Sequence, residues 1–456
     1  MGRRHTDNYT FLTQAPAHRV ILTMAVPTII TMLVTSLYNI ADTFFVGQLD
    51  TQSTAAVGVV FPVMFFIQAF GFFFGHGSGN YISRELGARR HGNAETMAST
   101  GFVYSLAAGT VAMVVGLYMI KPLAVWLGST PTILPYTESY MSIILLGAPF
   151  MTASLTINNQ MRLQGNASYA MYGIISGAVL NVVLDPVFIF VFDMGVAGAA
   201  VATVTGQVVG FFVLLAMSRR GENIRLDIRR FSPRLAYLKE IVYGGSPSLS
   251  RQGLGCVAVM MLNVAASEYG DAAIAAMSIV SRITMFIMSV VLGLGQGFQP
   301  FCGFCYGAGL YGRLREGFGF IVKVGTAFLL VFFFAGFFFS SGAIGIFRDD
   351  PEVIRIGAAA LCWQLATYPF NAFTMAGNMM LQTTRKPLRA NILSAARQGL
   401  FFIPLIVILP YFFGLKGIIV CQSCSDVLSF CIAIPIVVGA FREMDLSLIH
   451  ISEPTR

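Results

Sequence analysis

The chain has 456 residues, of which 56% are hydrophobic and only 11% are charged, and its formal net charge is +8. A soluble globular protein carries about 25% charged residues, so this composition excludes a water-soluble domain. It predicts an integral membrane protein.

Twelve apolar runs follow one another along the chain. A helix needs about 20 apolar residues to cross a bilayer. These runs are of that length and do not alternate in polarity, which favours helices over a β-barrel. The predicted fold class is therefore all-α, with 12 transmembrane helices. The predicted spans are residues 18–45, 55–82, 98–120, 137–160, 168–192, 196–217, 241–266, 272–300, 317–340, 355–380, 390–412 and 416–440.

The basic residues lie mostly in the loops on one side of the predicted bundle. With the N-terminus inside, the outer loops hold only Lys121, Arg348, Arg355 and Lys416, and the other basic loop residues are on the inner side. This positive-inside bias predicts that both termini are cytoplasmic. It also explains the net charge without a nucleic-acid partner. The basic inner-loop residues are Arg84, Arg89, Arg90, Arg219, Arg220, Arg225, Arg229, Arg230, Arg234, Lys239, Arg313, Arg315, Arg385, Lys386 and Arg389.

The second half of the chain repeats the first. Pro247 lies 220 positions after Pro27, and the same offset relates other glycines, prolines and asparagines in the same order. Two parallel repeats of six helices enclose a cavity, and rocking one against the other gives alternating access. The repeat therefore favours a transporter over a channel or a membrane enzyme. Further matched pairs are Gly75 and Gly295, Gly87 and Gly307, Pro149 and Pro369, and Asn158 and Asn378.

The repeat and the charged loop between its halves predict the domain organisation. The tail contains SLIHISEPTR, which resembles translated sequencing-adapter DNA, so we predict that it is not native. The predicted parts are an N-terminal six-helix lobe at 1–218, a basic cytoplasmic linker at 219–239, a C-terminal six-helix lobe at 240–442 and the tail at 443–456.

Four polar residues in the first half lie at similar predicted depth in three apolar spans: Asp42, Asn181, Asp185 and Thr203. Asn181 and Asp185 share a helix face, and Pro186 loosens the helix there. Two carboxylates in a poorly hydrated site need a proton or a cation between them. Their oxygen atoms suit Na⁺ as well as H⁺. The alternative for Asp42 is a plain residue at a helix end.

In the second half, Asp426, Arg251, Arg282 and Arg397 lie within predicted spans. A charged residue inside a membrane protein usually pairs with another charge. Asp426 is therefore expected to pair with Arg282 or Arg397, and this polar network either shapes the lobe or binds a ligand.

Two cysteine pairs have a spacing that also occurs in zinc sites, Cys302 with Cys305 and Cys421 with Cys424. The predicted topology places the two pairs on opposite sides of the bilayer. We therefore predict no zinc site and interpret these residues as small, reduced thiols.

At these residues the chain resembles the multidrug and toxin extrusion (MATE) transporters, and is most similar to the bacterial MepA-like and DinF-like branch. The resemblance covers about residues 20–440 and rests on several segments together. These are NIADTFFVGQL at 39–49, ISRELGARRHGNAE at 82–95, LNVVLDPVFIF at 180–190, GVAGAAVATV at 195–204 and GQGFQPFCGFCYGAG at 295–309.

The resemblance implies a V-shaped pair of lobes that exports cationic, amphipathic compounds against an inward H⁺ or Na⁺ gradient. It also implies a cation site at Asp42, Asn181, Asp185 and Thr203. A second cation site found in another branch needs acids that this chain lacks near Gly255 and at 362–380.

The leading functional prediction is therefore a cation-coupled antiporter in a bacterial cytoplasmic membrane. The alternative is a flippase of lipid-linked oligosaccharides, which Arg251, Arg282 and Arg397 favour and the two aspartates disfavour. No HExxH motif is present, and we expect no enzymatic activity. We expect no cofactor besides the coupling ion. The expected partners are the bilayer and small cationic substrates, and the protein is expected to be a monomer.

Overall fold

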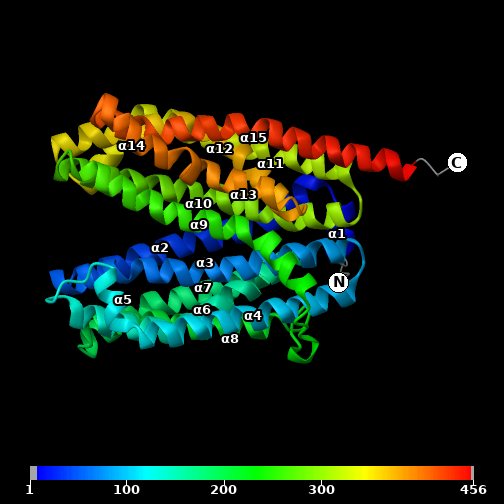
Figure 1. Ribbon diagram of the computed structural model, residues 1–456, viewed down its shortest axis with the longest axis horizontal. Helices are drawn as coiled ribbons and strands as arrows, with labels where there is room; N and C mark the ends of the chain where they lie inside the picture. Colours follow the sequence, from blue (N-terminus) through cyan, green and yellow to red (C-terminus); the bar gives the residue numbers. More distant parts are fainter. Residues whose placement is uncertain (1–7, 453–456) are drawn as a thin grey trace, which may run out of the picture.

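The computed structural model describes residues 8–452, with side chains described as far as Leu446, and these residues form helices and no strand (Figure 1). Three elements are short: α1 (Asn8–Gln14), α5 (Ile120–Trp126) and η2 (Ile228–Arg230). The long segments of the first half are α2 (Ala17–Gly47), α3 (Thr51–Gly87), α4 (His91–Tyr118), α6 (Leu134–Leu163), α7 (Ala167–Pro186) with η1 (Val187–Val191), and α8 (Gly195–Met217). Those of the second half are α9 (Leu235–Ser267), α10 (Asp271–Gly307), α11 (Tyr311–Phe347), α12 (Pro351–Thr383), α13 (Pro387–Ala395) with η3 (Ala396–Leu400) and α14 (Phe402–Phe413), and α15 (Leu415–Ser452).

Each predicted span falls on one of these long segments, which confirms the all-α prediction with its 12 helices. Eleven segments are both long enough and apolar enough to cross a membrane. The remaining one, α12, has 33 residues but carries several amide side chains. Gln364, Asn371, Asn378 and Gln382 are all at most 5% exposed. A helix can carry such groups through a bilayer when they are buried in protein.

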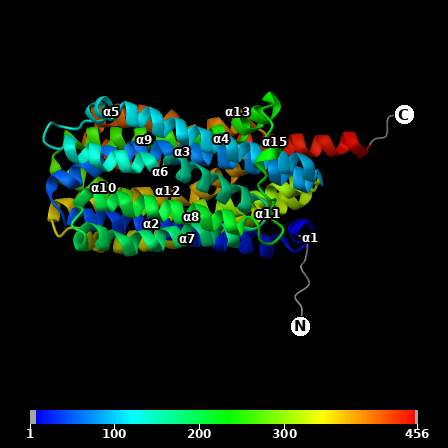
Figure 2. The same cartoon turned by 90° about the horizontal axis from the view of Figure 1, so that it is seen from below.

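The helices form two bundles that lie side by side. Helices α2 to α8 make the lower bundle of Figure 1, and α9 to α15 make the upper one. Figure 2 shows that α1 and the far end of α15 lie at the same end of the molecule. We refer to the bundles as the N-lobe and the C-lobe.

The predicted domain boundaries remain predictions. Helix α9 begins at Leu235, so residues 235–239 of the predicted linker are helical. Residues 1–7 of the predicted first lobe and residues 453–456 of the predicted tail lie outside the described residues.

The repeat extends to individual hydrogen bonds. In the N-lobe, Asn158 Nδ2 donates to the carbonyl of Ala170 at 2.9 Å. In the C-lobe, Asn378 Nδ2 donates to the carbonyl of Ala390, also at 2.9 Å. Donor and acceptor are each shifted by 220 positions (378 − 158 and 390 − 170). The same side chain therefore ties the same two helices together in both lobes.

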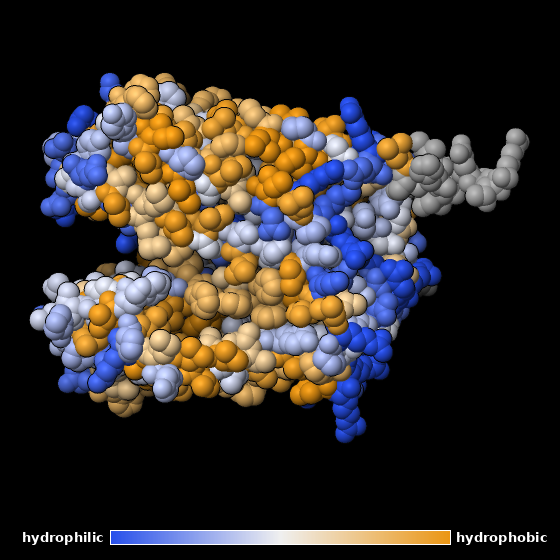
Figure 3. Space-filling view, in the orientation of Figure 1, coloured by the Kyte–Doolittle hydropathy of each residue, from blue (hydrophilic) through white to orange (hydrophobic). Residues whose placement is uncertain are grey.

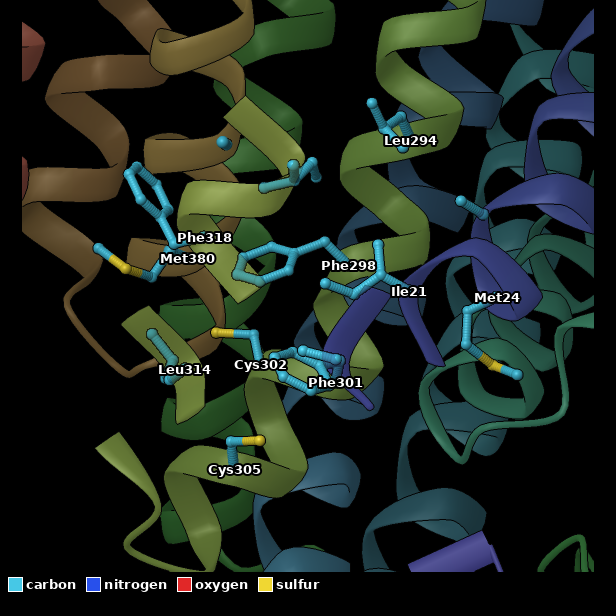
Figure 4. Packing of buried hydrophobic residues seen from close by; sticks show 14 of the residues in the cluster. Ile21, Met24, Leu294, Phe298, Phe301, Cys302, Cys305, Leu314, Phe318 and Met380 are labelled. Carbon is cyan, nitrogen blue, oxygen red and sulfur yellow. The ribbon is translucent and has the colours of Figure 1, made fainter. Parts of the chain in front are cut away.

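The lobes meet at the end of the molecule where α1 lies, which we call the closed end. There α2 packs against α10, and α3 packs against α9. Figure 4 shows Ile21 and Met24 of α2 next to Phe298 and Phe301 of α10, in one apolar core shared by both lobes. This shared core holds the closed end together.

Two glycines related by the repeat bring the lobes into backbone contact at this end. A Cβ on Gly87 would lie 2.4 Å from the carbonyl oxygen of Phe304. A Cβ on Gly307 would lie 2.0 Å from the carbonyl oxygen of Arg84. Residues 84 and 304 are themselves 220 positions apart (304 − 84). The contact is therefore close to two-fold symmetric, and a larger side chain would separate the lobes.

The opposite end is open. Figure 3 shows the surface hollowed between the two lobes at the end away from α1, which we call the cleft. It also shows hydrophilic surface at both ends and hydrophobic surface between them. Large apolar side chains of the membrane-spanning helix α11 are exposed, including Phe337, Phe338 and Phe339 at 72%, 73% and 70%. Such a band fits the hydrocarbon core of a bilayer.

Candidate functional site

Three of the four predicted cation-site residues contact one another in the N-lobe. Asn181 and Asp185 lie on α7 and Thr203 on α8. Asn181 Nδ2 donates to Asp185 Oδ1 at 3.4 Å and to Thr203 Oγ1 at 3.2 Å. All three side chains are at most 5% exposed. The structure therefore places a carboxylate, an amide and a hydroxyl together between two helices.

Asp42 joins this group from α2, the helix that packs beside α7. Its carboxylate and that of Asp185 are close enough to interact electrostatically. The hydroxyl groups of Tyr38 and Tyr140 lie within electrostatic range of both carboxylates. Asp42 is partly exposed, whereas Asp185 is fully buried. The site thus extends from a partly exposed aspartate to a fully buried one.

Several oxygen atoms of this group are buried without a hydrogen-bond partner among the described residues: Asp42 Oδ1, Asp185 Oδ2 and Asn181 Oδ1. No ion pair in the described part of the chain involves Asp42 or Asp185. A buried acceptor without a donor costs roughly 1–3 kcal/mol, and more when it is charged. The arrangement therefore suits a proton or a hard cation, which supplies the missing partner.

The backbone after Asp185 departs from regular helix. Pro186 follows it directly, and residues Val187–Val191 form the π-helical segment η1. Proline has no N–H group, and π-helical turns are short, irregular and frequent at functional sites. The sequence Asp-Pro therefore places the buried carboxylate at the junction of two helix types.

A cavity of about 100 Å³ adjoins the site. Besides Asn181 and Thr203, its polar lining includes Tyr38, Ser154 and Gln207. None of these three was predicted from the sequence. Tyr38 precedes Asp42 by four residues, and Gln207 follows Thr203 by four. Because residues four apart share a helix face, this spacing was the available signal for both, whereas nothing in the sequence pointed to Ser154.

The buried acid of the C-lobe, Asp426, is paired with an arginine. Asp426 Oδ1 accepts from Arg397 Nε at 2.7 Å, and from Gln422 Nε2 at 2.9 Å. Asp426 Oδ2 accepts from Asn371 Nδ2 at 3.0 Å. Asp426 is 0% exposed. Both carboxylate oxygens are therefore satisfied by protein groups, in contrast to those of the N-lobe.

The predicted second-lobe network is only partly assembled. Of the two predicted partners of Asp426, the structure selects Arg397. The other, Arg282, is exposed on α10 and belongs to no ion pair among the described residues. Arg251 lies elsewhere, where its Nη1 donates to Asn378 Oδ1 at 3.1 Å. Placing Arg282 and Arg251 in this network was therefore wrong, because neither arginine reaches the carboxylate.

A buried polar cluster crosses between the lobes. His76 of α3 contacts Ser248 of α9 through Nδ1 at 3.0 Å and Arg162 of α6 through Nε2 at 3.1 Å. Arg162 also donates to the carbonyl of Gln296 on α10. Gln382 of α12 donates to Ser248 at 2.8 Å. These residues link both lobes just above the closed end.

An ion-pair cluster lies deeper at the closed end. Glu240 of the C-lobe accepts from Arg84 of the N-lobe at 2.8 Å and pairs with Arg385 at 2.7 Å. Arg84 also donates to the carbonyl of Thr383 at 2.7 Å.

The seven cysteines are free, with Cys302 and Cys305 on α10 and Cys421 and Cys424 on α15. No group of metal-ligand type occurs among the described residues.

Two six-helix lobes that pack together around polar groups at one end, separate at the other and contain buried carboxylates are the architecture of a membrane transporter. The sequence model of the MatE family matches the chain twice, at residues 27–187 and 253–408, which together make up more than half of it. The chain belongs to this family, the MATE transporters, whose members are transporters rather than enzymes. The two matches also reflect the internal repeat.

Named relatives agree with this assignment. The chain is 28% identical over 413 residues to the multidrug export protein MepA of Staphylococcus aureus strain N315, covering 90% of this chain and 91% of that protein. It is 27% identical over 415 residues to MepA of Staphylococcus haemolyticus, covering 90% of each. The predicted resemblance to the MATE family is confirmed.

Solved structures show the same fold. One, described as the outward-facing conformation of a multidrug resistance MATE family transporter, aligns with a TM-score of 0.91 at 25% identity, covering 97% of this chain and 100% of the other. Another is a MOP superfamily transporter from Pyrococcus furiosus, whose description states that the reverse polarity of its binding pocket suggests a different function. It aligns with a TM-score of 0.90 at 25% identity and covers 97% and 100%.

Proposed function

We propose that this protein is a cation-coupled antiporter that exports cationic, amphipathic compounds across a bacterial cytoplasmic membrane. The observation that carries the proposal is the set of unpartnered acceptor atoms on Asp42, Asp185 and Asn181. Multidrug export is the activity named for the staphylococcal relatives. The coupling ion, H⁺ or Na⁺, binds in the N-lobe, and no other cofactor takes part. The partners are the bilayer and the small substrates, and the protein acts as a monomer.

The proposed orientation has both termini in the cytoplasm. The basic inner loops support it, because positively charged loops are retained on the cytoplasmic side. In this orientation the cleft of Figure 3 faces outward and the closed end faces the cytoplasm. The structural likeness to a transporter described as outward-facing supports the same interpretation.

The mechanism follows from competition for the N-lobe carboxylates. A cationic substrate is attracted to Asp42 and Asp185 when they are ionised. Binding of a proton or Na⁺ neutralises them and weakens that attraction. A ligand shifts a conformational equilibrium only by binding one state better than the other. Entry of the coupling ion from outside therefore releases the substrate there, and the ion-loaded protein turns inward.

The polar groups at the closed end act as a cytoplasmic gate in this scheme. The contacts of His76 with Ser248, of Arg162 with Gln296 and of Arg84 with Glu240 join opposite lobes. They are made when the cleft is open outward and must break when it opens inward. When the closed end opens, these polar groups can form hydrogen bonds with water instead. The gate can therefore alternate between a closed and an open state.

Efflux of a fluorescent cationic dye from right-side-out membrane vesicles tests the proposal, with the pH and Na⁺ gradients imposed separately. We expect dye transport with one gradient and none when both are dissipated. Transport that ignores both gradients and depends on an added nucleotide would contradict ion coupling.

One observation favours the second candidate, a flippase of lipid-linked oligosaccharides. Arg162 and Arg251 lie within the membrane-spanning part of the protein, and neither forms an ion pair with a described carboxylate. A pyrophosphate group is a suitable ligand for such arginines. Translocation of a labelled lipid pyrophosphate by reconstituted protein, without dye transport in the same vesicles, would replace the first proposal with this one.

A further inference from the structure

A basic pocket lies where helix α8 ends at the closed end of the molecule. Leu215, Ser218 and Arg219 from the end of α8, together with Arg225 and Leu226 from the linker, enclose about 390 Å³. The apolar span of α8 ends at Met217. The pocket therefore lies at the boundary between the hydrocarbon core and the aqueous phase.

The linker segment that forms one wall is fixed to the N-lobe. The backbone N–H of Ile224 donates to Gln164 Oε1 at 2.7 Å. Asn166 Nδ2 donates to Asn223 Oδ1 at 2.8 Å. The backbone N–H of Asp227 donates to Ser99 Oγ at 3.3 Å. Because α4 and the junction between α6 and α7 both hold this segment, the pocket is formed before any ligand binds.

Arg225 points outward for a simple geometric reason. The chain has no helical structure at Ile224, Arg225 and Leu226. Ile224 and Leu226 pack against buried clusters of the N-lobe. Arg225 lies between them and is exposed. Its guanidinium group is thereby directed away from the protein core and lines the pocket.

The positive charge of the pocket is not neutralised by protein. Among the described residues, no ion pair involves Arg219 or Arg225, whereas Arg230 of the same linker pairs with Glu95. The two acidic residues near them in the linker accept hydrogen bonds from backbone N–H groups instead. Glu222 accepts from the N–H of Asn8 at 2.8 Å, and Asp227 accepts from the N–H of Arg229 at 3.0 Å.

We propose that this pocket binds the headgroup of an anionic phospholipid from the leaflet at the closed end. Arg219 and Arg225 contact the phosphate, since guanidinium groups match phosphate oxygens with paired hydrogen bonds. Leu215 and Leu226 contact the glycerol and the first part of the acyl chains. In Figure 1 the linker is the green segment beneath the closed end, and Figure 3 shows hydrophilic surface there beside the hydrophobic band.

Native mass spectrometry tests the proposal on full-length purified protein titrated with phosphatidylglycerol or with phosphatidylcholine. The test variant is Arg219→Gln with Arg225→Gln. The control variant is Arg220→Gln with Arg229→Gln, which removes the same charge from exposed linker positions outside the pocket. A hydrogen bond to a charged group is strong enough that losing the two guanidinium groups weakens binding of the phosphate about 100-fold.

We expect the test variant to lose phosphatidylglycerol affinity by that factor while the control variant stays within about threefold of wild type. Equal losses in both variants would show that the attraction is diffuse and would overturn the proposal. Displacement of the bound lipid by millimolar glycerol phosphate would also overturn it, because the site would then bind a soluble phosphate. Wild-type protein that binds phosphatidylcholine as tightly as phosphatidylglycerol would also overturn the proposal.

Discussion

The two lobes pack one equivalent pair of helices in opposite ways. In the N-lobe, Gly177 of α7 and Gly206 of α8 touch backbone to backbone, and a Cβ on Gly177 would lie 2.6 Å from the carbonyl oxygen of Gly206. The positions 220 residues later hold Arg397 and Asp426 (397 − 177 and 426 − 206). There the side chains form an ion pair of 2.7 Å. This pair of helices is therefore joined by a close backbone contact in the N-lobe and by an ion pair in the C-lobe.

The acids of the N-lobe show the complementary difference. Asp42 and Asp185 correspond to Leu262 and Leu405 in the C-lobe (262 − 42 and 405 − 185). The N-lobe therefore holds carboxylates without a fixed cation, and the C-lobe holds a carboxylate whose cation is a tethered guanidinium. A site can exchange its cation only when no protein group occupies that place. Under the proposed mechanism, ion exchange takes place in the N-lobe, and the charged pair of the C-lobe has a structural role.

Removing the exchangeable charge has the largest expected effect. We expect Asp185→Asn or Asp42→Asn to reduce gradient-driven dye efflux to the vesicle background, at unchanged expression, because the amide keeps the size but cannot bind a proton. Asp193→Asn, in the exposed loop after η1, is the matched control and should transport normally. Wild-type efflux from Asp185→Asn would remove the N-lobe carboxylates from the mechanism.

Breaking the charged pair of the C-lobe should lower stability instead. Arg397→Gln leaves Asp426 buried without its cation, which costs about 3–5 kcal/mol for a buried pair. The measurement is thermal unfolding of purified protein in detergent. The double variant Arg397→Gln with Asp426→Asn should recover most of the loss, because no buried charge remains. No recovery in the double variant would indicate that Arg397 acts by packing alone.

The glycine contact of the N-lobe should be sensitive to a single methyl group. Gly177→Ala forces α7 and α8 apart, at a cost of about 1–3 kcal/mol for an overpacked contact. Gly255→Ala in α9 is the control, since a Cβ there has no atom within 4 Å. It should be neutral or slightly stabilising, because alanine favours helix over glycine. Equal unfolding temperatures for both variants would show that the close contact contributes nothing.

The smallest expected effect is on ion coupling in the C-lobe. Asp426→Asn should lower stability, yet leave the dependence of efflux on the imposed gradient unchanged, since the exchangeable site lies in the other lobe. Gradient-dependent efflux is compared with wild type in the same vesicles. Loss of gradient dependence with normal substrate binding would move the coupling site to the C-lobe.

The sequence was sufficient for the helices and for much of the candidate site. Long apolar runs predict spans directly, and spacing by four predicts that Asn181 and Asp185 share a face of α7. Matching depth brought Thr203 into the same group. These inferences succeeded because each depends on helix geometry or on position along the membrane normal, and both can be calculated from residue numbers.

The contacts between helices were less predictable. The choice between Arg282 and Arg397 as partner of Asp426 depends on helix rotation, and Arg397 lies in the π-helical segment η3, which alters the local turn. The contact of His76 with Arg162 and Ser248 involves three helices from two lobes. A sequence does not specify how lobes are oriented relative to one another, so this cluster required the structure.

The central claim is that substrate and coupling ion compete for the N-lobe carboxylates. Titration of a fluorescent cationic substrate onto purified protein between about pH 5 and pH 9 tests it directly. Protonation removes negative charge, so wild-type affinity should fall as the pH falls, and the two acids should titrate as a coupled pair. Asp426→Asn should keep this dependence, and Asp185→Asn should lose it. Affinity that is independent of pH in wild type, or a dependence that disappears only in Asp426→Asn, would contradict the account.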